Sequence, residues 1–76
     1  MDDGANKKFR ELLMELRKAA GLTQAELAQR LNRPQSFVSK YERGERRLDV
    51  IEFGEVATAL SVDPAKTLGK FYRETQ

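Results

Sequence analysis

Apolar residues recur along this chain at the three- and four-residue intervals of helices that bury one face. The first stripe lies between Lys7 and Ala20 and consists of Phe9, Leu12, Leu13, Leu16 and Ala20. Further stripes predict helices over about residues 24–31, 34 or 35 to 43, 50–60 and 64–72. No segment alternates polar and apolar residues as a strand does. The pattern predicts a compact, all-α domain of five helices.

Capping residues stand at the predicted helix starts. Thr23 and Glu26 have the spacing of a capping box, in which each side chain bonds the backbone N–H of the other residue. Asp49 and Glu52 repeat that spacing before the fourth helix, and Asp63 precedes a proline at the start of the fifth. These signals fix where the helices begin and leave a very tight turn between the second and the third.

The predicted third helix has two unlike sides. Its apolar side consists of Phe37, Val38 and Tyr41. Its polar side, spaced i, i+3, i+4, i+7, consists of Ser36, Ser39, Lys40 and Arg43. The polar side contains hydrogen-bonding and cationic groups without a carboxylate, which favours a polyanionic partner.

Positive charge is concentrated around this helix. Residues 1–47 carry 11 Lys/Arg against 7 Asp/Glu, whereas residues 48–76 carry 3 against 5. Between Arg30 and Arg47 six basic residues outnumber two acidic ones. The acidic, polar residues 1–6 are expected to form a flexible N-terminus, residues 7–73 a single domain, and residues 74–76 a loose tail.

Composition limits the chemistry open to the chain. Its 76 residues include neither Cys nor His, which excludes disulfides, thiolate metal sites and the commonest general base. With no glycine-rich phosphate loop either, we expect no enzyme, no cofactor, no metal and no small-molecule ligand. No apolar run reaches transmembrane length and no signal peptide is evident, so no membrane association and a cytoplasmic location are expected.

Residues 21–44 carry a family resemblance. The run GLTQAELAQRL, the tight turn and the closing SKYERG resemble the helix-turn-helix of Cro/CI-type (XRE-like) DNA-binding domains. The resemblance extends over about residues 9–72 and implies a lambda-repressor-like fold with a central helix-turn-helix. It also implies sequence-specific binding of double-stranded DNA by a small transcriptional regulator, a repressor or a controller. The helix from about Pro34 to Arg43 would enter the major groove.

The resemblance assigns roles to individual residues. Four match the base-facing positions of the recognition helix: Gln35, Ser36, Ser39 and Lys40. Six are candidates for phosphate contacts: Thr23, Gln24, Arg33, Arg43, Arg46 and Arg47. The alternative for Lys40 is a phosphate contact, and the capping role of Thr23 already explains that residue. An ordinary solvated side chain is the alternative for Gln35, Arg43, Arg46 and Arg47.

Three other residues are assigned to the protein interior. Similar domains pair a glutamate at the position of Glu42 with an arginine of the first helix, which matches Arg17. The alternative is two unrelated surface charges, which contribute at most ~1 kcal/mol. Phe37 is expected mainly to pack in the core, with contact to a thymine methyl as the alternative.

Two positions depart from the family pattern. Asn32 replaces the usual glycine of the turn, which is compatible with a left-handed conformation. Arg33 and Pro34 replace a Ser/Thr-type cap before the recognition helix, which removes one cap hydrogen bond. The same replacement is what makes Arg33 a candidate for an additional phosphate contact.

The predicted C-terminal helix carries candidates for an interface with another protein chain. A domain this small offers few base contacts, so a homodimer is expected, with an interface that includes Leu68, Phe71 and Tyr72. The alternative is that these residues only close the monomer core. A second hypothesis for function is a protein-interaction module, such as an antitoxin or adaptor, because the second half is acidic and the last helix aromatic.

Overall fold

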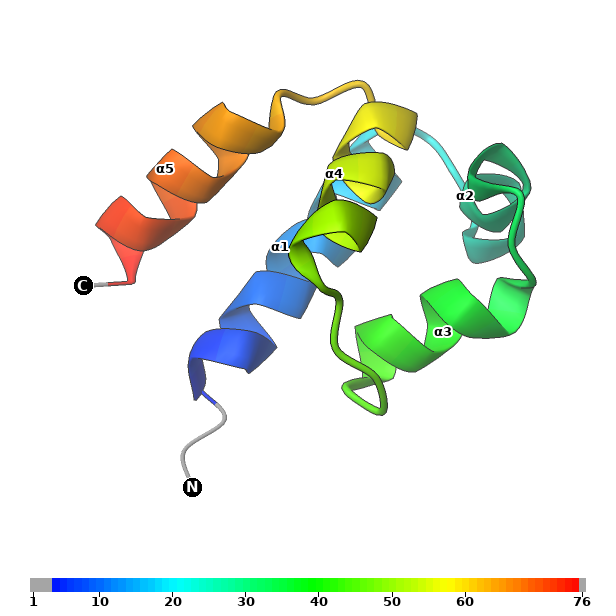
Figure 1. The fold of residues 1–76 in the computed structure, drawn as a ribbon, viewed down its shortest axis with the longest axis horizontal. Helices are drawn as coiled ribbons and strands as arrows, with labels where there is room; N and C mark the ends of the chain where they lie inside the picture. Colours follow the sequence, from blue (N-terminus) through cyan, green and yellow to red (C-terminus); the bar gives the residue numbers. More distant parts are fainter. Residues whose placement is uncertain (1–3, 76) are drawn as a thin grey trace.

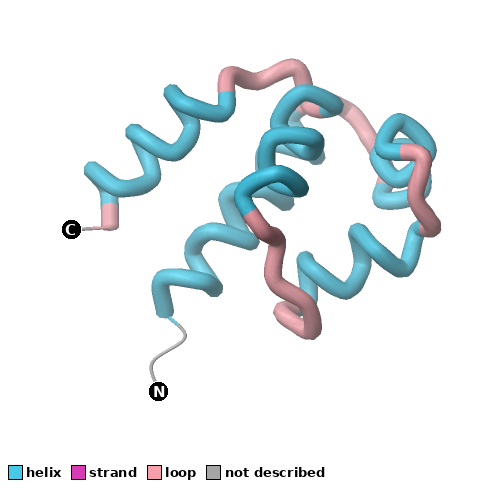
Figure 2. Tube along the Cα trace, viewed as in Figure 1, coloured by secondary structure: helices cyan, strands magenta, loops and turns pink. Residues whose placement is uncertain are grey.

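Five α-helices and no strand make up the described part of the chain, residues 4–75 (Figures 1 and 2). In this computed structural model the helices are α1 (Gly4–Ala19), α2 (Gln24–Leu31), α3 (Gln35–Arg43), α4 (Val50–Ala59) and α5 (Pro64–Glu74). Helix α3 packs against α1 and α2, and α4 packs against α2 and α5. In Figure 1, α1 and α4 occupy the centre, with α5 on one side and the α2–α3 pair on the other. The predicted five-helix, all-α fold is confirmed.

Reciprocal capping boxes fix the starts of α2 and α4. Thr23 Oγ1 accepts the Glu26 N–H at 3.0 Å, and Glu26 Oε1 accepts the Thr23 N–H at 2.8 Å. Asp49 and Glu52 form the same pair of bonds, at 2.7 and 3.0 Å. Asn32 ends α2 in a left-handed conformation with φ 56°, so it takes the place of the usual glycine. Local sequence signals therefore place both ends of α2 and the start of α4.

Two helix ends lie beyond their predicted positions. Helix α1 begins at Gly4, so residues 4–6 are helical where a flexible N-terminus was expected, and residues 1–3 lie outside the described residues. Helix α5 extends to Glu74, and Thr75 Oγ1 donates to the Phe71 carbonyl at 2.9 Å. At the other end of α1, Ala20 is exposed beyond the helix instead of completing its apolar stripe. Apolar periodicity reports which turns are buried, and backbone hydrogen bonding continues into turns that are not.

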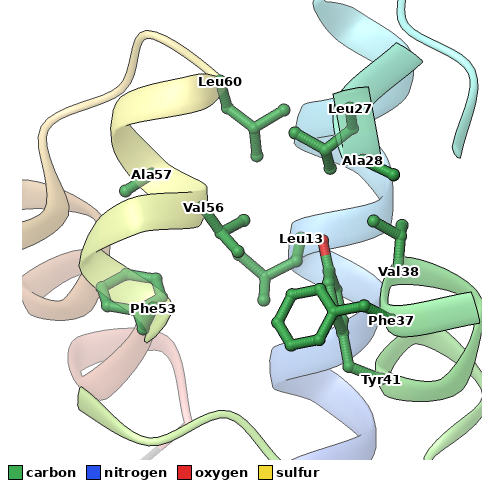
Figure 3. Packing of buried hydrophobic residues seen from close by; sticks show 10 residues of the cluster. All are labelled: Leu13, Leu27, Ala28, Phe37, Val38, Tyr41, Phe53, Val56, Ala57 and Leu60. Atoms are coloured by element: carbon green, nitrogen blue, oxygen red, sulfur yellow. The ribbon is translucent and has the colours of Figure 1, made fainter. Parts of the chain in front are cut away.

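Helices α1 to α4 enclose one hydrophobic core (Figure 3). Its largest fully buried side chains are Leu13 of α1, Leu27 of α2, Val38 of α3 and Val56 of α4, each less than 2% exposed. Burying a side chain of this size contributes about 1.5–3 kcal/mol. Because α3 supplies Phe37, Val38 and Tyr41 to this core, its opposite side is held toward solvent. Among residues 4–75, no helix has the length and apolar character needed to cross a bilayer.

Candidate nucleic-acid interface

The outer side of α3 presents the four residues predicted to contact bases. The buried residues of this helix are Phe37, Val38, Tyr41 and Glu42. The residues on the other side, exposed except for the half-buried Ser39, are Gln35, Ser36, Ser39 and Lys40. Glu42 is the single carboxylate in the α3 sequence and is only 4% exposed. The outer side therefore offers amide, hydroxyl and cationic groups with no negative charge of its own.

A buried ion pair joins α3 to α1. Arg17 Nε and Nη2 donate to the two carboxylate oxygens of Glu42 at 2.8 and 3.1 Å. The two side chains are 10% and 1% exposed. The third nitrogen, Nη1, donates to the Leu22 carbonyl at 2.8 Å, so the guanidinium also holds the loop before α2. The hydrogen bond to Glu42 raises the pKa of Arg17. This arrangement is the tether that the family resemblance implied for these two residues.

Gln24 extends the same network from the first turn of α2. Its Nε2 donates to Glu42 Oε1 at 2.8 Å, which leaves its other amide hydrogen and its oxygen for further partners. The preceding residue, Thr23, is exposed and uses its hydroxyl oxygen to cap α2. Both residues stand at the positive end of the α2 dipole, where an anion is favoured. Gln24 thus connects the buried tether to the surface where a phosphate contact was predicted.

Arg43 lies at the end of α3 in a solvent-exposed ion pair. Its Nε and Nη2 donate to the carboxylate oxygens of Glu45 at 2.8 and 3.2 Å, and the two side chains are 57% and 53% exposed. The pair raises the pKa of Arg43 and lowers that of Glu45. An exposed pair of this kind contributes little to stability, so Arg43 can exchange its partner for a phosphate.

Arg46, also predicted to contact phosphate, is half-buried and paired with a carboxylate of α4. Its Nη1 and Nη2 donate to the two oxygens of Glu52 at 2.9 and 2.6 Å. Glu52 is buried and still accepts the Asp49 N–H of its capping box. The Arg46 guanidinium and the Asp49 N–H together lower the pKa of Glu52 to about 2. Arg46 is therefore neutralised by a carboxylate at the start of α4.

Arg33 approaches the same carboxylate from the other end of α3. Its Nη1 lies 3.9 Å from Glu52 Oε2, and its Nη2 lies 3.4 Å from Glu55 Oε1. The Cζ atoms of Arg33 and Arg46 lie 4.4 and 4.8 Å from the centroid of the Phe37 ring, within cation–π range. Arg33, Phe37, Arg46 and Glu52 are called the Glu52 cluster below. Two predicted phosphate contacts thus share one aromatic ring and one carboxylate.

Sequence reasoning missed this role of Glu52. The spacing of Asp49 and Glu52 predicts a capping box and nothing more, and Arg46 precedes Glu52 across a loop whose path local rules do not determine. The available signal was indirect. Pro34 cannot cap α3 with a side chain, and an arginine stands directly before it, which points to another means of holding the helix start.

The three dimer-interface candidates on α5 differ in exposure. Leu68 packs against the core, and the Phe71 ring lies 5.3 Å from that of Phe9, so both are half-buried within the monomer. Tyr72 is 57% exposed. The alternative that these residues close the monomer core therefore describes Leu68 and Phe71, whereas Tyr72 still presents its ring to solvent.

A surface hollow lies beside these residues. It has a volume of about 340 Å³ and is lined from α4 by Val50 and from α5 by Phe71 and Tyr72. Arg47, the last of the predicted phosphate contacts, is exposed and lies at the same hollow. Val50 is 74% exposed and its neighbour Ile51 is 69% exposed, which is unusual for apolar residues at the start of a helix.

Comparisons with known proteins bear on this arrangement. A family model described as "Helix-turn-helix" matches residues 13–66, which include α2, α3 and α4 in full. Among solved structures, the chain is similar to an "XRE-family like protein from Pseudomonas syringae pv. tomato str. DC3000". The TM-score is 0.92 and the sequence identity 50%, over 97% of this chain and 90% of that one. No curated protein matches the chain.

Proposed function

The chain belongs to the XRE family of DNA-binding helix-turn-helix proteins, and from this premise we propose that it is a small transcriptional regulator of sequence-specific type. The observation that carries the proposal is the outer side of α3, which is exposed, free of carboxylates and held by the core. A helix of this width fits the major groove of B-form DNA. We infer that α3 is the recognition helix.

Base contacts are assigned to the first two turns of α3. Gln35 can present a donor and an acceptor together to the N6 and N7 edge of adenine, and Lys40 can donate to the O6 and N7 acceptors of guanine. Ser36 and Ser39 lie between them and suit either kind of base edge. Each matched pair of this type discriminates against the wrong base by ~1–3 kcal/mol.

Phosphate contacts are assigned to the residues around α3. Gln24 and Thr23 stand at the start of α2, where backbone N–H groups and the helix dipole attract an anion. Arg43 and Arg47 are exposed on the other flank of the recognition helix. Arg33 and Arg46 have weaker claims, because Glu52 already accepts from Arg46 and lies beside Arg33. Such contacts set the position on the duplex and leave sequence to the base contacts.

A homodimer is proposed as the binding unit. The dimer surface would include Tyr72 and Val50, which border the same hollow and are the exposed parts of an otherwise buried apolar region. A second copy is the occupant that fits, because two helix-turn-helix units on a twofold axis read half-sites about one helical turn, ~34 Å, apart. Leu68 and Phe71 would contribute through their half-buried edges.

The exposed apolar residues at the start of α4 also favour the second hypothesis, a module that binds another protein. Val50 and Ile51 together with Tyr72 are the large apolar residues that stand most exposed among residues 4–75. The two functions predict different binding partners for the purified protein. A protein-interaction module would co-purify with one partner and hold no duplex DNA at low salt.

Selection of bound fragments from random or genomic duplex DNA tests the regulator. We expect one enriched motif, bound with an affinity whose logarithm falls by ~0.9 per neutralised phosphate for each unit of log salt concentration. Gel-shift titration of the selected fragment gives the stoichiometry. If the selection enriches no motif at any salt concentration, sequence-specific regulation is contradicted.

A further inference from the structure

The two residues that flank the recognition helix converge on Glu52. Arg33 directly precedes Pro34, and Arg46 follows the Gly44 turn that ends α3. Both guanidiniums lie within 4.0 Å of a Glu52 oxygen, Arg46 at 2.6 Å and Arg33 at 3.9 Å. A single carboxylate of α4 is thus placed between the entry to α3 and the exit from it.

The ring of Phe37 lies under both guanidiniums. It belongs to the first turn of α3, is 8% exposed, and meets Tyr41 of the next turn edge-on at 5.7 Å between ring centroids. A guanidinium prefers the face of an aromatic ring, and the preference grows when water is excluded. Because Phe37 belongs to the first turn of α3, a guanidinium held beside its ring adds to the contacts that the core makes with this turn.

The first turn is the part of α3 that lacks the usual support. Its N-cap residue, Pro34, is extended with ψ 152° and forms no side-chain hydrogen bond to the free N–H groups. Yet the turn carries Gln35 and Ser36, two of the proposed base contacts. A side chain that positions this turn would therefore also position these two contacts.

We propose that Glu52 is a positioning residue for DNA recognition, which holds Arg46 against Phe37, with Arg33 beside it, and so supports the first turn of α3. The proposal rests on the proposed function. It has an electrostatic consequence as well. The Glu52 carboxylate neutralises Arg46 and attracts Arg33, so the cluster weakens binding to unrelated DNA while it sharpens binding to the specific site.

Glu52→Gln isolates this role. Glutamine also suits the third helical position of a capping box, so the Asp49 N–H keeps its acceptor and α4 keeps its start. What disappears is the charge that holds the two guanidiniums. Arg46→Lys is a second variant, since lysine keeps the positive charge but lacks the planar fork that bonds both Glu52 oxygens.

The experiment measures the dissociation constants of full-length wild type and variants for the selected fragment and for an unrelated duplex of equal length, each at several salt concentrations. For Glu52→Gln the ratio of specific to unrelated affinity is expected to fall at least about fivefold, the loss of one misaligned base contact. The salt slope on the unrelated duplex is expected to steepen by ~0.9 for each arginine released. For Arg46→Lys we expect the same fall in the ratio.

Two controls separate positioning from stability. Glu55→Gln removes the exposed carboxylate that accepts from Arg33 at 3.4 Å and keeps the bonds between Arg46 and Glu52, so it should lower the ratio less than Glu52→Gln does. Leu13→Ala destabilises the core away from the Glu52 cluster. Because it lowers the folded fraction of the protein, it should weaken binding to both duplexes equally. An equal loss on both duplexes, or an unchanged ratio and slope, for Glu52→Gln and Arg46→Lys would overturn the proposal. Wild-type protein that prefers no duplex would instead overturn the proposed function, and this inference with it.

Discussion

At the scale of single residues, Glu42 both stabilises the fold and fixes the position of α3. Its two oxygens accept two hydrogen bonds from Arg17 of α1 and one from Gln24 of α2, although it belongs to α3. One carboxylate therefore joins three helices behind the surface that we propose faces DNA. Burying a charge is unfavourable unless it is paired and hydrogen-bonded, and both conditions hold here.

Removing the Glu42 carboxylate should lower the free energy of unfolding of the domain. Glu42→Ala leaves the Arg17 guanidinium buried with the Leu22 carbonyl as its remaining acceptor, and we expect a loss of about 3 kcal/mol in the free energy of unfolding. Urea denaturation followed by circular dichroism measures it. Glu45→Ala breaks the exposed pair with Arg43 and serves as the matched control, with no resolvable change expected. Equal midpoints for the two variants would show that the buried pair does not tether α3.

Tyr41 buries its ring in the core together with a hydroxyl that lacks a hydrogen-bond partner among residues 4–75. The residue is 2% exposed, and no residue between 4 and 75 forms a hydrogen bond with the hydroxyl oxygen. Burial raises the pKa of this phenol. Because an unsatisfied buried group is destabilising, Tyr41→Phe should raise the free energy of unfolding by roughly 1 kcal/mol. The same substitution at the exposed Tyr72 should have no effect. A loss of stability in Tyr41→Phe would mean that the hydroxyl is satisfied after all.

At the scale of elements, the junction of α3 with α4 is held by charge more than by apolar contact. Arg46 and Glu52 close the loop between the two helices, and the bonds to Glu52 lower its pKa to about 2. A carboxylate whose pKa is lowered on folding stabilises the protein fully above the unfolded value, near 4.5, and loses that contribution as pH falls toward 2.

The lowered pKa of Glu52 therefore predicts that the junction of α3 with α4 loses stability in acid. Between pH 4.5 and 2 the wild type should lose thermal stability more steeply than Glu52→Gln, so the difference between their melting temperatures should shrink over that range. Glu26 also has a lowered pKa, but it is present in both proteins and cancels in the comparison. The measurement is a series of thermal melts by circular dichroism. Parallel curves for the two proteins would contradict a stabilising role for the Glu52 charge.

Elements also differ in how far the sequence predicted them. The starts of α2 and α4 followed from Thr23 and Asp49, because a capping box involves residues three apart. The bonds from Arg46 to Glu52 depend on how the chain turns after Gly44, which no local spacing determines. Ser61 shows the same limit, since it adopts φ 61° after α4 where the sequence offers no glycine. Short-range hydrogen bonds were predictable from the residues themselves, whereas the Arg17–Glu42 contact between two helices was expected only through the family resemblance.

At the scale of the whole molecule, the exposed apolar residues lie away from the core that α1 to α4 enclose. Helix α5 contributes no fully buried residue, and its aromatic side chains cover Phe9 and border the hollow near Val50. Of the two alternatives for α5, closing the monomer core describes Phe71, whereas contact with a second copy stays a prediction for Tyr72. Self-association through this surface would place two recognition helices in one assembly.

A charge at Val50 should prevent that association without harming the fold. Val50 is the first residue of α4, where a glutamate interacts favourably with the helix dipole. Val50→Glu should therefore raise the dimer dissociation constant at least about tenfold, as expected for removal of a central apolar contact. Sedimentation equilibrium measures it, with Ala65→Glu in the exposed first turn of α5 as control. A wild type that stays monomeric at high micromolar concentration would contradict the dimer in solution.

Fragment selection with two variants shows whether the outer side of α3 reads the sequence of DNA. Lys40→Ala should select a motif that differs from the wild-type motif at one position of each half-site, because Lys40 is assigned to a base. Arg47→Ala should select the wild-type motif with lower affinity, because Arg47 is assigned to a phosphate. Identical motifs for the wild type and Lys40→Ala, or a changed motif for Arg47→Ala alone, would contradict the role proposed for α3.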